Sequence, residues 1–433
     1  MNFKSVIYST LFVAIVLVWV SSNINWRKDK WRGLLESDAK GYYAYLPAVF
    51  IYQDLNFGFF DQIEKEKYYQ EHLYYDYRIG AHNSVINKYY CGTAIAQAPF
   101  FFIAHGLSIL DKQDLDGYSK WYMLMINIAA ICYHLLGVFF LGKLLLKYQL
   151  NAWWIFLILL TASFGTNLFA YTIVEPGMSH VFSFAFISMF LYHSKMFFEE
   201  SKARYLLISA ILLGLVVLCR PVNGLILFSL PFIAGSWDKL KKGLQYIQRE
   251  SLGALTAFLF FIVICSIQLI IYKLSTGHYF IYSYGQEKFN FLDPHLLEIL
   301  FSYKKGLFLY TPVYFVSLLG LSWLWRNSRF GFFSCLSFLL LITYVFSSWW
   351  MWYYGGSFSS RVYVEYIPLF MILLAIGLNE TKQKKLRITL ISITIVLTLL
   401  CQVQSYQYRY YDIHYSEMTK EKYWEVFLMR NRL

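Results

Sequence analysis

Long apolar runs recur along the chain, and short polar segments separate them. Most of these runs approach or reach the roughly 20 residues that a helix needs to cross a bilayer. They lack the alternation of a half-buried strand, and backbone groups inside lipid must bond within helices or closed barrels, so we expect helices. The expected apolar helices cover residues 4–22, 93–110, 121–142, 152–171, 179–197, 205–219, 221–235, 252–274, 306–325, 331–350, 362–378 and 387–404.

This pattern predicts an all-α fold, a polytopic membrane protein with about 11–12 transmembrane or re-entrant helices in one membrane domain, residues 1–433. The first run follows Lys4, and no small-x-small cleavage site comes after it, so we interpret it as a retained helix rather than a signal peptide. Two polar stretches lie outside the runs: a long first extracytoplasmic loop, 23–92, and a C-terminal tail, 405–433.

The composition agrees with this class, since 58% of the residues are hydrophobic and only 15% are charged. A soluble domain could not bury so much apolar surface. The net charge of +12 does not indicate a nucleic-acid partner, because the basic residues lie in short loops and no basic tract is interleaved with aromatic residues. The six cysteines are scattered without a CxxC pair and point to no metal site.

Basic residues mark alternate loops, which the positive-inside rule assigns to the cytoplasm. The outer side would then carry the site-bearing segments described below. One conflict follows: with residues 23–92 also outside, the run 93–110 has no full crossing left to make, so it is re-entrant or interfacial, or one loop is on the other side. The basic residues that mark the inner loops are Lys143, Lys147, Lys195, Lys202, Arg204, Lys239, Lys241, Lys242, Arg249, Arg326, Arg329, Lys382, Lys384, Lys385 and Arg387.

The stretch "ESDAKGYYAYLPAVF" (36–50) follows the first helix and combines acids with apolar residues at helical spacing. We expect a juxtamembrane helix that lies in the interface, with its tyrosines at headgroup depth and Asp38 at its N-terminus. Asp38 is then either a helix cap or a carboxylate that serves as a general base or metal ligand. Glu36 would point elsewhere and is the weaker candidate. The apolar stripe consists of Tyr42, Tyr45, Leu46, Val49 and Phe50.

Two further outer segments carry ionisable residues at the edge of the hydrocarbon. In "EPGMSH", Glu175 and His180 are costly unless they are paired or hydrated, although Glu175 could also cap the helix that includes Pro176. In "CRPVNG", Arg220 lies on the side that the positive-inside rule disfavours, so we expect a partner, either an anionic ligand or Glu175, unless the side chain snorkels to lipid headgroups.

The segment "SYKKGLFLYTPVYF" places Lys304 and Lys305 at headgroup depth, where the two ammonium groups suit a substrate phosphate or a lipid headgroup. The segment "WWMWYYGGSFSSRVYVEYIP" combines aromatic residues, among them Trp350 and Tyr354, with Arg361. Arginine suits bidentate phosphate contacts, and aromatic faces suit sugar rings. The plain alternatives are an aromatic belt and an Arg361–Glu365 pair at i,i+4.

These segments resemble the GT-C superfamily of membrane glycosyltransferases, which take sugar from a polyprenyl-phosphate or polyprenyl-diphosphate carrier. The segments "SDAKGYYAYLPAVF", "GTNLFAYTIVEPGMSHVFSF", "KKGLFLYTPVYF" and "WWMWYYGGSFSSRVYVEYIP" are similar to those of bacterial proteins near the protein-mannosyltransferase and aminoarabinose-transferase branch. In the superfamily, the acidic residue of the first outer loop, here Asp38, is a base or metal contact. Arg361 and Lys305 would match contacts to the carrier phosphate.

The resemblance implies an inverting enzyme in a bacterial inner (plasma) membrane, with its active site facing the periplasm or exterior. Its partners would be a polyprenyl-phosphate-linked sugar donor, membrane lipids, and a lipid, glycan or protein acceptor. No cofactor is certain, and a divalent metal ion remains an open alternative. The candidate catalytic residues are Asp38 and Glu175, and the candidate substrate-binding residues are Arg361, Arg220, Lys304, Lys305, His180, Trp350 and Tyr354.

Other classes share part of this pattern. A transporter or flippase of lipid-linked sugars should show internal pseudo-symmetry, and we find none in the sequence. A polysaccharide ligase or polymerase usually has its large outer loop late in the chain, whereas the longest loop here, 23–92, is early. A structural subunit with a degenerate site is a further alternative that only an assay distinguishes.

Overall fold

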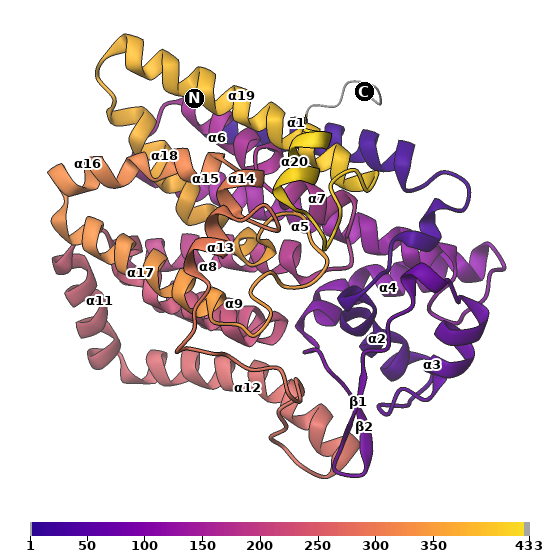
Figure 1. Ribbon diagram of the computed structural model, residues 1–433. Coiled ribbons are helices and arrows are strands. Elements are labelled where there is room, and N and C mark those ends of the chain that lie inside the picture. Colours follow the sequence, from indigo (N-terminus) through magenta and orange to yellow (C-terminus); the bar gives the residue numbers. More distant parts are fainter. Residues whose placement is uncertain (1, 428–433) are drawn as a thin grey trace.

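Helices make up nearly all of the regular structure (Figure 1), which confirms the all-α polytopic class. The computed structural model describes residues 2–427, and in that part of the chain eight helical segments are long and apolar enough to cross a membrane. They are α1 (Asn2–Ile24), α4 (Gly92–Leu110), α5 (Lys120–Leu145), α8 (Ser179–Glu200), α12 (Ser251–Thr276), α17 (Arg329–Ser347), η6 with α18 (Arg361–Tyr366 and Ile367–Glu380) and α19 (Lys384–Arg409).

Shorter apolar helices complete the bundle. Three of them have the composition of membrane helices: α6 (Ala152–Phe164), α9 (Ala203–Cys219) and the pair η5–α10 (Pro221–Ser229 and Leu230–Ala234). The amphipathic α11 (Trp237–Arg249) lies at one end of the bundle (Figure 1). The run 93–110 forms one continuous helix, α4, that is long enough to span, which leaves the conflict in the predicted loop sides open.

Two predicted helices are interrupted. The run 306–325 was expected to be one helix, but it forms α14 (Leu307–Tyr310), α15 (Val313–Ser317) and α16 (Leu319–Asn327). Pro312 lacks the backbone N–H that a continuous helix requires, so the break falls beside it. The run 152–171 likewise divides into α6 and α7 (Leu168–Ile173), with the chain turning at Gly165.

The segment 23–92 is folded rather than an open loop. It contains a β-hairpin, β1 (Arg78–Ala81) and β2 (Ser84–Asn87), in which Arg78 is opposite Asn87. Its two turn residues, His82 and Asn83, both have positive φ, as a two-residue type I′ hairpin turn requires. The helical turns of this segment are η1 (Lys30–Gly33), α2 (Asp38–Phe50), α3 (Phe59–Gln62), η2 (Ile63–Lys67) and η3 (Glu71–Leu73).

Helix α2 begins at Asp38, as expected, but its apolar stripe packs mostly on protein. Its tyrosines are buried in the protein, and the hydroxyl of Tyr45 donates to the carbonyl of Tyr89 at 2.6 Å. Gly41 allows the ring of Tyr89 to approach, because a Cβ at this position would lie 2.3 Å from that ring. The interfacial prediction for Tyr42 and Tyr45 is therefore wrong, since their stripe packs on protein and only the end of the helix, Val49 and Phe50, is exposed.

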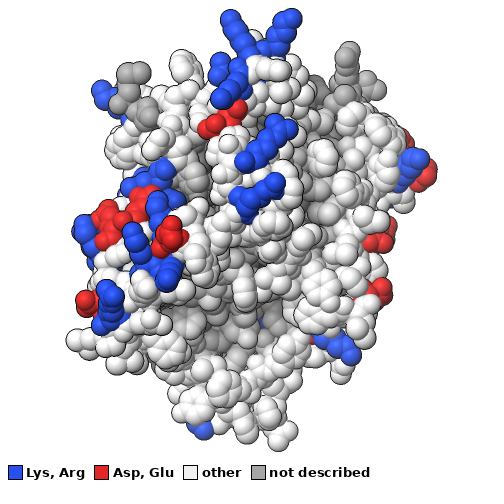
Figure 2. Space-filling model, turned by 90° about the vertical axis from the view of Figure 1, so that its left-hand side faces the viewer, with Lys and Arg blue, Asp and Glu red and all other residues white. Residues whose placement is uncertain are grey.

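Charged residues gather at the end of the molecule that carries α11 and lies opposite the hairpin (Figure 1). Figure 2 shows this end, where clusters of lysine and arginine alternate with acidic side chains. Ion pairs join residues of the predicted inner loops here: Lys147 to Glu199 at 3.1 Å and Lys202 to Glu200 at 2.6 Å. Such a cluster of charged side chains is typical of a surface at the level of the lipid headgroups. The side of the membrane on which this surface lies stays a prediction.

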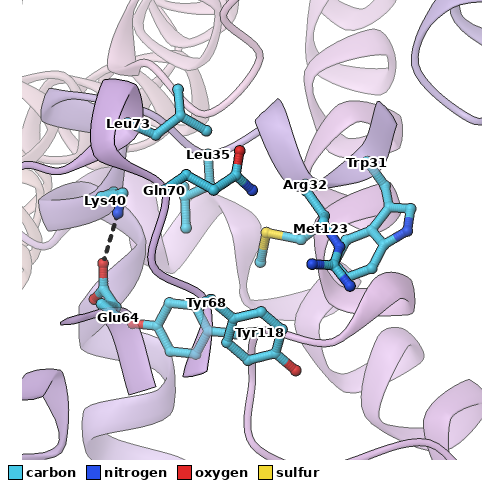
Figure 3. Close-up of a pocket in the computed structure, with 10 residues that line it drawn as sticks. All are labelled: Trp31, Arg32, Leu35, Lys40, Glu64, Tyr68, Gln70, Leu73, Tyr118 and Met123. Atoms are coloured by element: carbon cyan, nitrogen blue, oxygen red, sulfur yellow. Dashed lines mark hydrogen bonds and ion pairs between the residues drawn. The ribbon is translucent and has the colours of Figure 1, made fainter. Parts of the chain in front are cut away.

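A buried ion pair attaches α2 to the rest of the first outer segment. Lys40 Nζ lies 3.5 Å from Glu64 Oε2, and Figure 3 shows the two side chains pointing toward each other. The hydroxyls of Tyr77 and Tyr118 both donate to the other oxygen of Glu64 at 2.8 Å. The cavity beside this pair measures about 30 Å³, so it has room for water but not for a larger ligand. We interpret this cluster as structural.

Removal of the Glu64 carboxylate should therefore lower the thermal stability of the protein more than removal of an exposed carboxylate nearby. Glu64→Ala leaves the Lys40 ammonium buried without its partner, a change that costs roughly 3–5 kcal/mol in comparable sites. The measurement is the thermal unfolding midpoint of the purified protein in detergent. The control is Glu66→Ala, which removes an exposed carboxylate of the same short helix. Equal midpoints for the two variants would contradict the structural role of the pair.

Candidate functional site

A cavity of about 490 Å³ lies where several segments that the sequence predicts to be on the outer side meet. This volume is typical of small-molecule sites. Five of the residues predicted from the sequence line it, namely Asp38, Arg220, Trp350, Tyr354 and Arg361. The other lining residues are Ser37, Tyr42, Tyr75, Lys88, Tyr89, Tyr90, Pro221, Val222, Tyr282, Tyr284, Glu287, Phe289, Trp349, Met351, Gly355 and Gly356.

Asp38 and Arg361 form the centre of this site. Arg361 Nη2 donates to Asp38 Oδ2 at 2.7 Å, and the hydroxyl of Tyr89 donates to Asp38 Oδ1 at 2.6 Å. The hydroxyl of Tyr75 lies 2.5 Å from that of Tyr89. The residue at the N-cap position of α2 is Ser37, and the donors to the two Asp38 oxygens are the side chains of Tyr89 and Arg361 rather than backbone N–H groups of the helix. These contacts favour the alternative in which the carboxylate belongs to the cavity over the helix-cap alternative.

The charge on Asp38 is maintained by its neighbours. Burial acts to raise the pKa of Asp38, but the Arg361 guanidinium, the Tyr89 hydroxyl and the Lys88 ammonium outweigh it, so the pKa lies below its usual range. Asp38 is therefore ionised at neutral pH, and a carboxylate with two fixed donors is held in one orientation.

A second ion pair includes Arg220, which also lines the cavity. Arg220 Nη1 donates to Glu365 Oε1 at 3.2 Å, and His180 Nδ1 lies 3.0 Å from the same oxygen. Arg220 comes directly after the last residue of α9 and just before Pro221. The helix is broken at this point, and the side chain of Arg220 lines the cavity. The prediction that Glu175 pairs with Arg220 is therefore wrong, because the carboxylate that pairs with Arg220 is that of Glu365. The local pair of Arg361 with Glu365 is wrong as well.

The remaining cavity wall is aromatic. Trp349 and Trp350 follow the end of α17, and the chain then turns through Tyr354 and Gly355, which both have positive φ. Trp350 is 48% exposed, whereas Tyr354 is only 9% exposed. Phe289 packs edge-on against Trp349, with ring centroids 4.8 Å apart. Such a wall offers flat apolar faces next to the charged pairs.

Four predicted site residues do not reach the cavity. Glu175 is buried and accepts a hydrogen bond from the hydroxyl of Tyr408, and His180 lies behind the lining, against Glu365. The Lys305 ammonium donates to the carbonyl oxygens of Ser357 and Tyr415, and burial lowers its pKa to about 7. The Lys304 ammonium lies 3.6 Å from the centroid of the Tyr353 ring.

Glu36 and Glu175 are outside the set of residues that line the cavity. Burial and the nearby charge of Glu175 raise the pKa of Glu36 to about 8. The charge of Glu36 also acts on Tyr408 in α19 and on Tyr411 just after this helix, where it helps to raise the pKa of each phenol.

Several site residues were not predicted from the sequence. Tyr89 and Lys88 come from "NKYYCG" after the hairpin, and Glu287 comes from the segment between α12 and α13 (Leu296–Phe301). A lysine and two tyrosines before a helix are ordinary in a membrane protein, and nothing in their spacing joins them to Asp38. Only the folded hairpin brings them to the cavity.

The donor set does not fit a divalent ion at Asp38. Within residues 2–427, no three His, Cys, Asp or Glu side chains form a group that could hold a metal ion. Both oxygens of Asp38 accept hydrogen bonds from protein donors. Divalent cations prefer several oxygen ligands, so the residues present do not supply a metal site here.

Comparisons with solved structures identify the class of this fold. No family model matches the chain, and no curated protein does either. The chain is similar to the apo form of an Archaeoglobus fulgidus oligosaccharyltransferase, with a TM-score of 0.52 and 10% identity, over 96% of this chain and 57% of that chain. The oligosaccharyltransferase AglB of the same organism, in complex with an inhibitory peptide and a dolichol-phosphate, gives a TM-score of 0.49 and 9% identity over 97% and 57% of the two chains.

The chain thus spans a little over half the length of these oligosaccharyltransferases. The first comparison covers nearly all of the chain and shows that its fold is similar to that of this archaeal oligosaccharyltransferase. The fold-level part of the resemblance is therefore confirmed.

The raised pKa of Glu36 predicts a pH-dependent loss of stability. An acid whose pKa is higher in the folded than in the unfolded state disfavours folding progressively as pH rises from its unfolded pKa, roughly 4.3, to its folded pKa, about 8. Glu36→Gln should therefore stabilise the protein at about pH 8 and have little effect at about pH 4. Unfolding midpoints of both proteins across this range provide the measurement. A pH-independent difference would contradict the assigned shift.

Proposed function

We propose that the chain is a glycosyltransferase that moves a sugar from a polyprenyl-(di)phosphate carrier to an acceptor at the outer face of the membrane. One observation carries the proposal: a single cavity contains a fixed carboxylate, two guanidinium groups and an aromatic wall, in a chain with the GT-C fold. The shared fold alone does not define an activity, so the chemistry of the cavity supplies the argument.

The two arginines suit the carrier phosphate. Each uses a nitrogen to bind a protein carboxylate, Asp38 for Arg361 and Glu365 for Arg220. Arg361 Nε is buried and has no hydrogen-bond partner, so the guanidinium has an unused donor. A buried unpaired donor is costly, and a phosphate would remove that cost if the guanidinium turned to present Nε to it.

The aromatic wall suits the sugar. A pyranose presents apolar C–H faces and polar edges, which match the rings of Trp349 and Trp350 and the phenol groups of Tyr75, Tyr282 and Tyr284 in the lining. This arrangement places aromatic surface and hydrogen-bonding groups in the same cavity as the arginines, as a phosphate-linked sugar requires.

The proposed reaction is a single displacement at the anomeric carbon. The acceptor hydroxyl attacks that carbon, the bond from carbon to the phosphate oxygen breaks, and the phosphate leaves with the electron pair. Asp38 orients the hydroxyl and accepts its proton as the new bond forms. Arg361 and Arg220 stabilise the charge that develops on the leaving phosphate. One displacement inverts the anomeric configuration.

The low pKa of Asp38 fits orientation of the acceptor in the ground state better than early proton removal. Substrate that engages Arg361 would weaken the pairing of Asp38 and raise its basicity as the reaction proceeds. The donor set offers no metal site, and no step above requires one.

The sequence segments that resemble known families support a more specific proposal. We propose a bacterial inner-membrane enzyme near the protein-mannosyltransferase and aminoarabinose-transferase branch, with a lipid, glycan or protein as acceptor. The transporter, flippase and ligase alternatives gain no specific support from the cavity, because a carboxylate fixed beside two arginines suits bond cleavage at a phosphate-linked carbon.

Asp38→Asn should abolish transfer while the protein still folds. The amide can still accept a hydrogen bond from Arg361, but it cannot take a proton, so turnover should fall by roughly 10²–10⁴-fold. Transfer from a polyprenyl-phosphate-linked sugar to membrane acceptors is the measurement. Asp61→Asn is the control, because Asp61 is an exposed acid of the same outer segment. Near-normal turnover of Asp38→Asn would exclude the proposed role.

The predicted side of the membrane is tested separately. Single cysteines at Gln53 and Glu66, both exposed in the first outer segment, should react with a membrane-impermeant maleimide in intact spheroplasts. A cysteine at Lys241, in exposed α11, should react only after lysis. The background is a variant in which the six native cysteines are replaced by alanine or serine. The reverse pattern would place the active site in the cytoplasm.

A further inference from the structure

A third ion pair lies in the wall of the cavity. Lys88 Nζ donates to Glu287 Oε1 at 2.6 Å, and both residues line the cavity. The two side chains are only 19% and 26% exposed, and 199 positions separate them in the sequence. Neither residue has a role in the reaction proposed above.

Lys88 lines the cavity, and two hydrogen bonds fix its backbone. Its N–H donates to the carbonyl of Tyr77 at 2.9 Å, and its carbonyl accepts from the hydroxyl of Ser283 at 2.7 Å. The ammonium lies 5.8 Å and 5.6 Å from the ring centroids of Tyr89 and Tyr284. Its positive charge also contributes to the lowered pKa of Asp38, so it is within electrostatic reach of that carboxylate.

The partner of Lys88 differs from the partners of the two arginines. Asp38 starts helix α2, and Glu365 is fully buried in η6. Glu287 lies in the stretch 277–295, which contains no helix of its own, and Lys88 is the partner of its carboxylate in the described part of the chain. A lysine ammonium is a point charge on a flexible stem, so it can change partners at little cost. The pair is thus the most exchangeable of the three.

We propose that Lys88 is a third ligand of the substrate phosphate and that Glu287 is its internal competitor. In the empty cavity, Glu287 neutralises Lys88. When a phosphate enters between Arg361 and Arg220, the Lys88 ammonium moves from the carboxylate to the phosphate. This inference rests on the proposed function, because it assigns the charge selectivity of the same cavity.

The exchange has a chemical consequence. Glu287 repels any anion that enters, so a ligand must offer enough negative charge to attract Lys88 and both arginines at once. A phosphate ester meets that requirement, whereas an uncharged polyprenol gains nothing from the three cations. Discrimination then comes from a repulsive group as well as attractive ones.

Binding of sugar-free polyprenyl phosphate to the purified protein in detergent tests this role, because the two single variants should change affinity in opposite directions. Lys88→Gln removes a phosphate ligand and should weaken binding about tenfold. Glu287→Gln frees Lys88 and removes a repulsive charge, so it should tighten binding about threefold. The double variant should lose most of the gain. Quenching of the cavity tryptophans reports binding.

Lys65→Gln is the charge-matched control, since Lys65 is an exposed lysine of the same outer segment, and it should leave affinity unchanged. An uncharged polyprenol should bind all variants alike. If both single variants weaken binding, the pair only fastens the segment 277–295, and the inference is wrong; if neither changes it, Lys88 does not touch the phosphate. If the wild-type protein does not bind polyprenyl phosphate, the proposed function itself fails.

Discussion

The contact between Asp38 and Arg361 is the constraint on which the site depends. It joins the start of α2 to the start of η6 across 323 positions of sequence, so both ends of the chain must be in place before it can form. Because both charges are largely shielded from water, each stabilises the other, and either one alone would be costly. The hairpin adds Tyr89 to the same carboxylate. The proposed catalytic geometry thus coincides with an ion pair that joins two distant parts of the chain.

The two arginines show how the protein keeps cations available near lipid. Each is paired with one carboxylate from a different element, and both arginines line the cavity. Full pairing would leave nothing for a ligand, and no pairing would make the empty cavity unstable. Partial pairing resolves this conflict and makes the site complementary to one additional anion.

The sequence predicts the candidate residues of the site better than it predicts their contacts. Arg220 was recognisable because a cation on the side that the positive-inside rule disfavours requires an explanation. Arg361 was recognisable because arginine suits bidentate phosphate contacts, and Trp350 and Tyr354 accompanied it in one segment. The partners were missed. Arg361 and Glu365 were paired by the i,i+4 rule of α-helices, but residues 361–366 form a 3₁₀ helix, whose three residues per turn point the two side chains in different directions. The apolar stripe of α2 predicts a lipid-facing surface, but it packs on protein. Apolar periodicity shows that one face of a helix is buried, and it does not show whether lipid or protein covers that face.

The helix breaks explain why the site lies where it does. Continuous helices bury their backbone groups internally, so side chains alone would line a cavity between them. In this chain the apolar runs stop short at Cys219, before the charged Arg220, and at Ser347, before the aromatic turn. Irregular backbone at such depth survives only against protein or a water-filled space, and the cavity supplies that space. These two helix ends therefore place Arg220 and Trp350 at one cavity, which continuous spans could not do.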